Sequence, residues 1–174
     1  VGVADILGLD GRIEDSSQAP LVGDDPATDL VRLQSMGGAN VAGLLNVRPS
    51  PALGMTPLLY IGNAVQKKFL FKVAGDLFKE EHGNDLAVTA AGTVWIGATV
   101  FDKKGGSKTT GAVIVTDSFG AVQVRSDIDI GRNFEPLAVT MAPDGGVFLA
   151  GRADDEANGV TIKRGWLAET DKKG

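Results

Sequence analysis

Short apolar runs separated by glycine-rich turns follow one another along the chain, and they predict strands rather than helices. In the best-defined stretch we expect strands over residues 86–89, 93–101, 111–116 and 121–125, because runs of roughly four to eight apolar and β-branched residues between turn residues are typical of strands. Joined by short turns, they form a four-stranded antiparallel meander. The run 94–100 does not alternate between apolar and polar positions, which predicts a strand covered on both faces.

This pattern recurs later in the chain. Gly111–Gly120 and Gly165–Gly174 share glycine, threonine, aspartate and glycine at a constant offset of 165 − 111 = 54. The segment Leu86-Ala-Val-Thr89 recurs unchanged at Leu137–Thr140, an offset of 137 − 86 = 51. Two matches in the same order indicate an internal repeat.

A third block lies between these two. Gly92–Gly97 resembles Gly145–Ala150 at an offset of 145 − 92 = 53. We align all three blocks by treating Pro143-Asp144 as an insertion in the intervening turn. The chain is therefore predicted to consist of tandem units of about fifty residues, each a supersecondary unit that packs on the next.

Earlier copies are less regular. Residues 58–62 and 68–77 have the spacing of the second and third strands of a unit, and residues 3–13 resemble a third strand, an Asp-Gly turn and a fourth strand. Residues 25–36 are compatible with a capped helix or with a strand, because an Asp-Pro start suits a helix whereas the following alternation suits a strand. Residues 46–57 contain three prolines and predict an irregular loop.

Over residues 84–174 the order of motifs is an aliphatic-Ala-Val-Thr strand, a Pro-Asp-Gly-Gly turn, a Val-Phe-Leu-Ala-Gly strand and a Trp-Leu-x-x-Thr-Asp-x-x-Gly strand and turn. This order resembles the blade repeat of bacterial β-propeller proteins of the delta-60 and SBBP types. The resemblance implies architecture and not activity, since its motifs are turn chemistry.

We therefore predict an all-β protein of tandem four-stranded antiparallel meanders, like β-propeller blades. One repeat domain spans residues 1–174, with units at about 11–75, 76–125 and 126–174. A complete propeller has typically four to eight blades. About three units therefore indicate part of a longer chain, copies that associate into a ring, or another β architecture such as a sandwich.

Composition narrows the classes of partner. The 174 residues include 24 glycines and no cysteine, and the net charge is −5. Glycine at about twice its average usage fits many tight turns. The negative charge gives no electrostatic reason to bind nucleic acid, and no window is long and apolar enough for a membrane-spanning helix. We expect a soluble protein whose compartment stays open, with an extracytoplasmic, secreted location favoured over a cytoplasmic one.

The acidic segment 154–159 is the candidate metal site. Asp154, Asp155, Glu156 and Asn158 offer the oxygen ligands that Ca²⁺ takes in loops. Their spacing does not match the alternate-residue pattern of an EF-hand loop, so we favour a solvated turn between strands over a Ca²⁺ site. No other cofactor is predicted.

No catalytic motif stands out. His82, the sole histidine, lies in an acidic segment with Glu80, Glu81 and Asp85, but a general base needs a positioned partner that no second motif supplies. We favour a solvated turn between units for this segment.

Aromatic residues are assigned to the core. Trp95, Phe148 and Trp166 occupy strand positions that the repeat places on the inward face, where large rings contribute most to packing.

Two functions fit these features. The first is a noncatalytic β-repeat binding or scaffold module that presents its loops to a protein or glycan partner, and the absence of a catalytic motif favours it. The alternative is a fragment of a propeller enzyme whose active site lies at the central channel and is built by several blades.

Overall fold

The computed structural model describes residues 3–7, 13–18, 28–63, 65–66 and 68–172, and these residues form strands, turns and loops without a helix. The strands are β1 (Val3–Leu7), β2 (Ile13–Gln18), β3 (Thr28–Gly37), β4 (Asn40–Val47), β5 (Thr56–Asn63), β6 (Lys68–Val73), β7 (Glu80–Val88), β8 (Val94–Phe101), β9 (Thr109–Thr116), β10 (Val122–Ile128), β11 (Phe134–Met141), β12 (Val147–Ala157) and β13 (Val160–Thr170). The predicted all-β class is confirmed.

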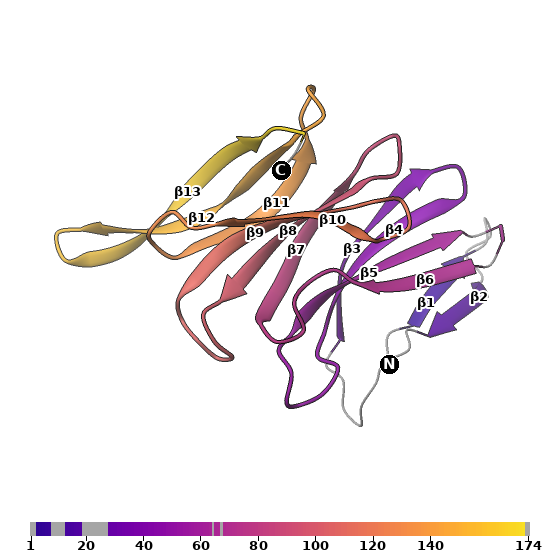
Figure 1. The fold of residues 1–174 in the computed structure, drawn as a ribbon, viewed down its shortest axis with the longest axis horizontal. Helices are drawn as coiled ribbons and strands as arrows, with labels where there is room; N and C mark the ends of the chain where they lie inside the picture. The colour runs from indigo at the N-terminus through magenta and orange to yellow at the C-terminus, as the bar shows by residue number, and fades with distance from the viewer. Residues whose placement is uncertain (1–2, 8–12, 19–27, 64, 67, 173–174) are drawn as a thin grey trace.

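The strands form consecutive antiparallel meanders. Strands β3 to β6 make sheet I, β7 to β10 make sheet II, and β11 to β13 make the three-stranded sheet III, while β1 and β2 pair with each other. Within each sheet every strand pairs with its neighbour in sequence, so the tandem meanders predicted from the repeat are confirmed. The three sheets follow one another across the molecule, with sheet II in the middle (Figure 1).

Two apolar cores hold the three sheets together. Leu44 and Leu59 of sheet I pack with Leu86 and Ile96 of sheet II in the first core. The opposite face of sheet II packs on sheet III in the second core, which contains Trp95. Because alternate residues of a strand point to opposite faces, a strand between two cores is apolar at nearly every position. All residues from Val94 to Val100 are buried accordingly, as their lack of alternation predicted.

A β-bulge lies at the same place in the first strand of sheets I, II and III. The ladder skips Val31 in β3, Asn84 in β7 and Leu137 in β11. The differences 84 − 31 and 137 − 84 are both 53, and the residues after each bulge pair with Leu44, Gly97 and Ala150, which are also 53 apart. A bulge places two residues opposite one and increases the local twist, so all three sheets share one register.

This register corrects the alignment of the Leu-Ala-Val-Thr segments. Leu86 pairs with Ile96 and Val139 pairs with Leu149, so Leu86 corresponds to Val139 at 139 − 86 = 53. Leu137 is instead the bulge residue and is 45 % exposed. The sequence identity is therefore two residues out of structural register. Along a regular strand a shift of two keeps each side chain on the same face, so the hydrophobic pattern of the segment reveals the shift only at the bulge residue Leu137.

The turn after the first strand contains no insertion. Thr89 N donates to Thr93 O at 2.9 Å, and Ala142 N donates to Gly146 O at 2.9 Å. Since both pairs are 53 residues apart, the turns are of equal length, and the interpretation of Pro143-Asp144 as an insertion is wrong.

Sheet I resolves the open assignments in the first half. Residues 28–37 form strand β3, so the strand alternative for residues 25–36 holds where the structure describes them, and residues 25–27 lie outside the described part. The proline-rich loop is shorter than residues 46–57, because β4 extends to Val47 and β5 begins at Thr56. Strands β1 and β2 form the antiparallel pair expected over residues 3–13, while residues 8–12 of the expected turn are outside the described ones.

Two segments predicted as turns are strands. His82 lies within β7, which begins at Glu80, rather than in a turn between units. The acidic residues 154–156 and Ala157 belong to β12, and the turn is confined to Asn158-Gly159. No helix in the described part of the chain is long and apolar enough to cross a membrane.

Candidate functional site

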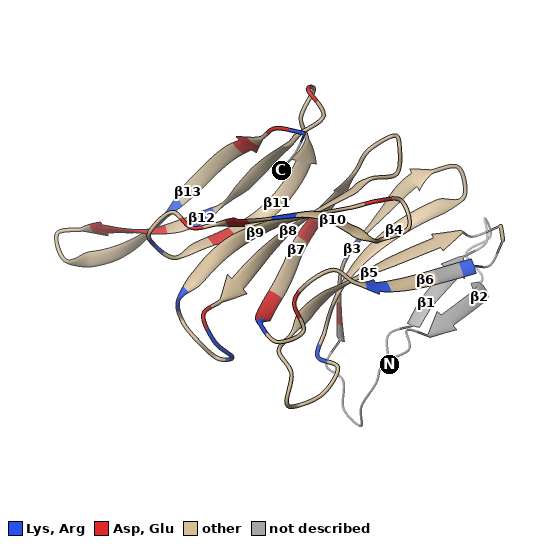
Figure 2. Cartoon of the chain, viewed as in Figure 1, with Lys and Arg blue, Asp and Glu red and all other residues tan. Residues whose placement is uncertain are grey.

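A groove of about 530 Å³ opens where sheets II and III end. Its walls come from the β8–β9 loop, the β10–β11 connection and the ends of β12 and β13. The groove is lined by Ser107, Lys108, Gly131, Arg132, Asn133, Asp154, Asp155, Glu156 and Thr161. Three of the four residues predicted as metal ligands therefore line a common groove, although they come from a strand. Acidic and basic residues are interspersed around this end of β12 and β13 (Figure 2).

Asn133 holds the groove together. Its Oδ1 accepts a hydrogen bond from Thr109 N at 3.0 Å, and its Nδ2 donates to Asp154 Oδ2 at 2.8 Å. Its backbone oxygen also accepts from Asp154 N at 2.9 Å. One side chain thus ties the start of β9 in sheet II to β12 in sheet III, so the two walls cannot separate without losing these bonds.

A tight turn directs Arg132 into the groove. Gly131 has a φ of 74°, and its N donates to Asp129 Oδ1 at 2.8 Å. Left-handed φ suits glycine, and an aspartate that accepts a bond from the amide two residues on is an Asx turn. Arg132 Nη1 then lies 3.2 Å from Asp155 Oδ1.

The two aspartates of β12 lie on opposite faces of their strand, because consecutive strand residues alternate. Asp154 is 3.1 Å from Lys163 Nζ, and the Asn133 hydrogen bond, followed by Lys163, lowers the pKa of Asp154. Asp155 is paired with Arg164 Nε at 2.6 Å. Asp154 is therefore engaged by Lys163, and Asp155 by Arg132 and Arg164, rather than both carboxylates meeting at one centre.

Asn158 has a turn role that the sequence signals directly. It has a φ of 55° and Gly159 a φ of 74°. Positive φ at both central residues is the pattern of the type I′ hairpin turn, for which Asn-Gly is the strongest signal. Across the described residues, no three His, Asp or Glu side chains are grouped as a metal centre requires. Calcium binding by Asp154, Asp155, Glu156 and Asn158 stays a prediction.

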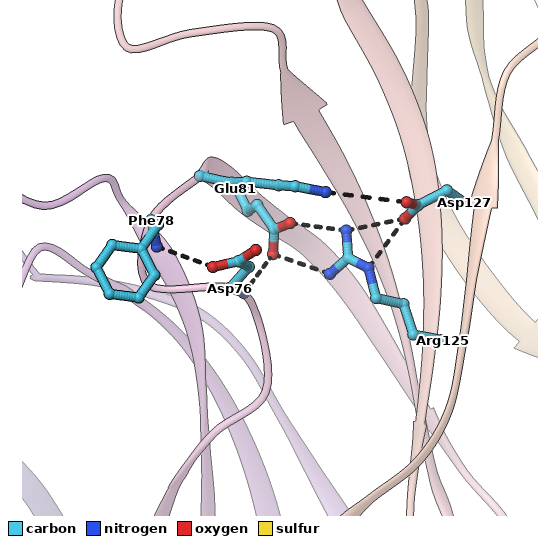
Figure 3. Close-up of polar contacts among 6 residues, drawn as sticks. Asp76, Phe78, Glu81, Arg125 and Asp127 are labelled. Carbon is cyan, nitrogen blue, oxygen red and sulfur yellow. Dashed lines mark hydrogen bonds and ion pairs between the residues drawn. The ribbon is translucent and has the colours of Figure 1, made fainter.

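A second polar cluster joins sheets I and II around Glu81. Its carboxylate is fully buried and pairs with Arg125 through two bonds, Nη2 to Oε1 at 2.7 Å and Nη1 to Oε2 at 3.1 Å. Asp76 N also donates to Glu81 Oε2, and Arg125 continues to Asp127 (Figure 3). Burial opposes the charged form of Arg125, but Glu81 and then Asp127 raise its pKa above the ordinary value.

Glu80 forms the other half of this cluster. Its Oε1 is 2.7 Å from Arg48 Nη2 and 3.2 Å from His82 Nε2, and its Oε2 accepts from Met55 N at 3.0 Å. Burial alone would raise the pKa of Glu80, yet the bond from Met55 N, with His82 and Arg48, holds that pKa below its ordinary value. The ring of His82 lies 5.0 Å from that of Phe101. These contacts clamp β7 to the loop before β5.

Glu80 and Asn133 are equivalent in the repeat, since 133 − 80 = 53. Each accepts a hydrogen bond from a backbone N at the start of a third strand, Met55 N for Glu80 and Thr109 N for Asn133, both at 3.0 Å. These two equivalent hydrogen bonds were not predicted from the sequence. The available signal was the spacing of 53 between two polar residues, one at the start of β7 and one directly before β11.

The aromatic residues divide between core and surface. Trp95 is 2 % exposed in the second core, which confirms its assignment as a core residue. Trp166 is half-buried against the same core, with its ring 4.3 Å from that of Phe134. Phe148 lies between Val147 and Leu149, which face sheet II, so alternation directs it to the opposite face. Its inward assignment is wrong.

A second groove, of about 570 Å³, lies at the turn ends of sheets I and II. Amide side chains and apolar groups share its wall, and Phe119 is 69 % exposed there. Among its lining residues are Met36, Asn40, Ile61, Asn63, Gln66 and Phe119. Asn63 Nδ2 donates to Asn40 Oδ1, and Asn63 Oδ1 accepts from Gln66 N, so the amides are held in place.

Comparison with models of known protein families finds no match to this chain, and comparison with curated proteins finds none either.

Proposed function

We propose that the chain is a noncatalytic β-repeat module that binds a charged segment of a partner protein in the groove between sheets II and III. The observation that carries this proposal is the convergence of exposed charges of both signs from separate elements. Lys108 comes from the β8–β9 loop, Arg132 from the β10–β11 connection, and Asp155 and Glu156 from β12. Complementary charges at such a rim guide association and select the partner.

The ion pairs at the groove are exchangeable. Arg132 and Asp155 have side chains 48 % and 32 % exposed, and exposed pairs contribute only about 0–1 kcal/mol. A partner carboxylate can therefore replace Asp155 on Arg132, and a partner ammonium can replace Arg132 on Asp155, at little cost. The groove wall contains no aromatic ring, so a polypeptide fits its chemistry better than a sugar that needs a ring to stack on.

A phage-displayed library of random peptides, selected on the immobilised chain, tests this proposal. We expect enriched peptides rich in charge, whose affinity falls with rising salt and falls roughly tenfold in Lys108→Glu. Lys103→Glu is the matched control, because Lys103 is exposed on the same loop but outside the groove lining. Peptides that bind Lys108→Glu and Arg132→Glu as tightly as the natural chain would contradict the proposal.

The amide-lined groove between sheets I and II favours a second candidate, a glycan. Amide groups hydrogen-bond sugar hydroxyls, and the exposed ring of Phe119 offers an apolar face for stacking. A glycan array probed with the labelled chain should give signals that Phe119→Ala removes. Signals of equal strength in Phe119→Ala would assign them to another surface.

The alternative of a propeller-enzyme fragment draws support from the first strands, which are the ones that would line a central channel. Arg32 Nε of β3 lies 3.5 Å from Asp85 Oδ1 of β7. Asp85 is committed to a further structural contact, however, since its Oδ2 accepts from Val139 N at 2.9 Å. A carboxylate engaged on both oxygens is a poor general base, so the binding module remains our preferred function.

A further inference from the structure

The hairpin of β12 and β13 ends in an exposed Asn-Gly turn. The two strands pair without interruption up to Ala157 and Val160, so Asn158 and Gly159 alone form the turn. Both turn residues are exposed. The tip of the hairpin extends away from the three sheets (Figure 1), and none of residues 156–161 belongs to a core cluster. The turn can therefore change its conformation without disturbing the packing between sheets.

Two groups that can react with each other are adjacent in this turn and uncommitted. Within the described part of the chain, neither the side-chain amide of Asn158 nor the N–H of Gly159 is hydrogen-bonded to another residue. Gly159 also has open space around it, since a Cβ placed there would meet no atom within 4 Å. A glycine nitrogen reaches the preceding side chain more easily than that of any other residue, because no side chain hinders its approach.

We propose that Asn158 deamidates spontaneously in the folded chain, by attack of the Gly159 nitrogen on its Cγ. The nitrogen gives up its proton to solvent and forms a bond to Cγ. The bond from Cγ to Nδ2 breaks, and the departing amide nitrogen takes a proton from water and leaves as ammonia. Water then opens the resulting succinimide ring at either carbonyl and yields aspartate or isoaspartate. The net reaction adds one water and releases one ammonia, so it needs no oxidant or cofactor.

The other asparagines of the chain lack this combination. Each is followed by a residue with a side chain. Each also has its side chain in a hydrogen bond within the described structure. These five residues are Asn40, Asn46, Asn63, Asn84 and Asn133. Deamidation of the folded chain is therefore expected at Asn158 alone.

The Asp144-Gly145 turn shows the opposite situation in the same sheet. Aspartate followed by glycine can form the same ring, with loss of water in place of ammonia. Here, however, Gly145 N donates to Ala142 O at 3.1 Å, and Asp144 Oδ1 accepts from Gly146 N at 3.0 Å. Both reacting groups are held, so this turn should be protected by the fold whereas the Asn158 turn is not.

The two products act differently on the groove between sheets II and III. Aspartate keeps the turn, because Asp-Gly also suits type I′ geometry, and adds one negative charge at the end of the hairpin. Isoaspartate adds a carbon to the backbone and lengthens the two-residue turn. Glu156 and Thr161, which pair with each other and line the groove, then lose the turn that fixes their register. The modification does not depend on what the groove binds, so either proposal can fail alone.

Peptide mapping of the full chain after incubation in warm, mildly alkaline buffer tests the proposal. Trypsin releases residues 153–163, in which Asn158 is the only asparagine, and deamidation raises the mass of this peptide by about 1 Da. We expect conversion within about tenfold of the rate in a synthetic peptide 153–163, since opening of an exposed turn costs little free energy. Asp144 should isomerise at least about tenfold more slowly than in its own synthetic peptide.

Asn158→Gly is the matched control, because Gly-Gly also suits the type I′ turn. On isoelectric focusing the natural chain should accumulate an acidic band that Asn158→Gly lacks. If peptide 153–163 from the folded chain stays unmodified while the synthetic peptide converts, the hairpin protects the turn and the proposal is wrong. Conversion of all asparagines of the folded chain at one rate also overturns it, because the reaction would then belong to unfolded chains.

Discussion

Asp85 Oδ2 accepts a hydrogen bond from Val139 N at 2.9 Å, across the boundary between sheets II and III. Asp85 follows the bulge in β7, and Val139 is the second residue after the bulge in β11. The first strand of a sheet lies at its edge, so half of its amides have no partner within the sheet. A carboxylate from the preceding sheet satisfies one of these amides.

Removing this carboxylate should destabilise the chain. We expect Asp85→Ala to lower the free energy of unfolding by about 1–3 kcal/mol, because the partly buried amide of Val139 loses its acceptor. Urea denaturation followed by circular dichroism measures the change. Glu169→Ala, on the exposed side of β13, is the control and should change it by less than about 0.5 kcal/mol. Equal stability of the two variants would show that the bond contributes nothing.

Trp95 should be the most sensitive core position. Trp95→Ala is expected to cost about 3–5 kcal/mol, as truncation of a fully buried aromatic residue does. Among the described residues none accepts a hydrogen bond from its Nε1, so Trp95→Phe, which removes that unpaired donor, should cost clearly less. Phe119→Ala provides an exposed aromatic control. A near-neutral effect of Trp95→Ala in urea denaturation would contradict the packing of sheet II on sheet III.

The Glu81–Arg125 pair should behave as a unit. Glu81→Leu leaves Arg125 without its main partner in a partly buried site, and we expect a loss of roughly 3 kcal/mol of unfolding free energy. The double variant Glu81→Leu/Arg125→Leu should be more stable than the sum of the single losses predicts, because no uncompensated charge remains. Additive losses in the double-mutant cycle would show that the two side chains do not interact.

Acid should weaken the contacts of the Glu80 carboxylate with Arg48, His82 and Met55. Its pKa in the folded chain lies below the ordinary value of 4.5, so the carboxylate contributes stability that is present above that value and is lost as pH falls through the folded pKa. We expect the melting temperature of Glu80→Gln to fall less steeply than that of the natural chain below about pH 4.5. Glu169→Gln should follow the natural chain. If the melting temperatures of Glu80→Gln and of the natural chain fall equally below about pH 4.5, this linkage is wrong.

Calcium can be tested directly at the acidic segment of β12. If Asp154, Asp155, Glu156 and Asn158 bind Ca²⁺, millimolar calcium should raise the melting temperature by mass action, and Asp155→Ala should abolish the rise. Magnesium is the control ion, since it demands a smaller, more rigid octahedral site. Identical melting curves with calcium and with a chelator would end the hypothesis.

The sequence predicted best those strands and turns that are determined by residues adjacent in the chain. The strands predicted over 93–101, 111–116 and 121–125 are present with ends shifted by at most three residues. They were predictable because apolar runs and glycine turns mark them directly. The start of β7 at Glu80 was missed, since its first residues are charged and resemble a turn until Arg48 and Arg125 are brought against them.

The sequence predicted the carboxylates of the candidate groove but not which cations they contact. Asp154, Asp155 and Glu156 stood out as carboxylates. Two of the cations that engage the aspartates, Arg132 and Lys163, lie 22 and 9 residues from Asp154 in sequence (154 − 132 and 163 − 154). Which cation meets which carboxylate depends on strand register. The Asn158-Gly159 turn fixes that register, and interpreting it as part of an acidic loop concealed the hairpin.

The recurring bulge determines where the repeat tolerates a change of length. A bulge residue is an extra one, opposite no partner, so deleting Leu137 would leave every later side chain of β11 on its present side of the sheet. Deleting Leu149 in the regular ladder of β12 would instead invert the side chains between it and the turn. Insertions and deletions within a unit should therefore be accommodated at Val31, Asn84 and Leu137, and not in the regular ladders of the second strands.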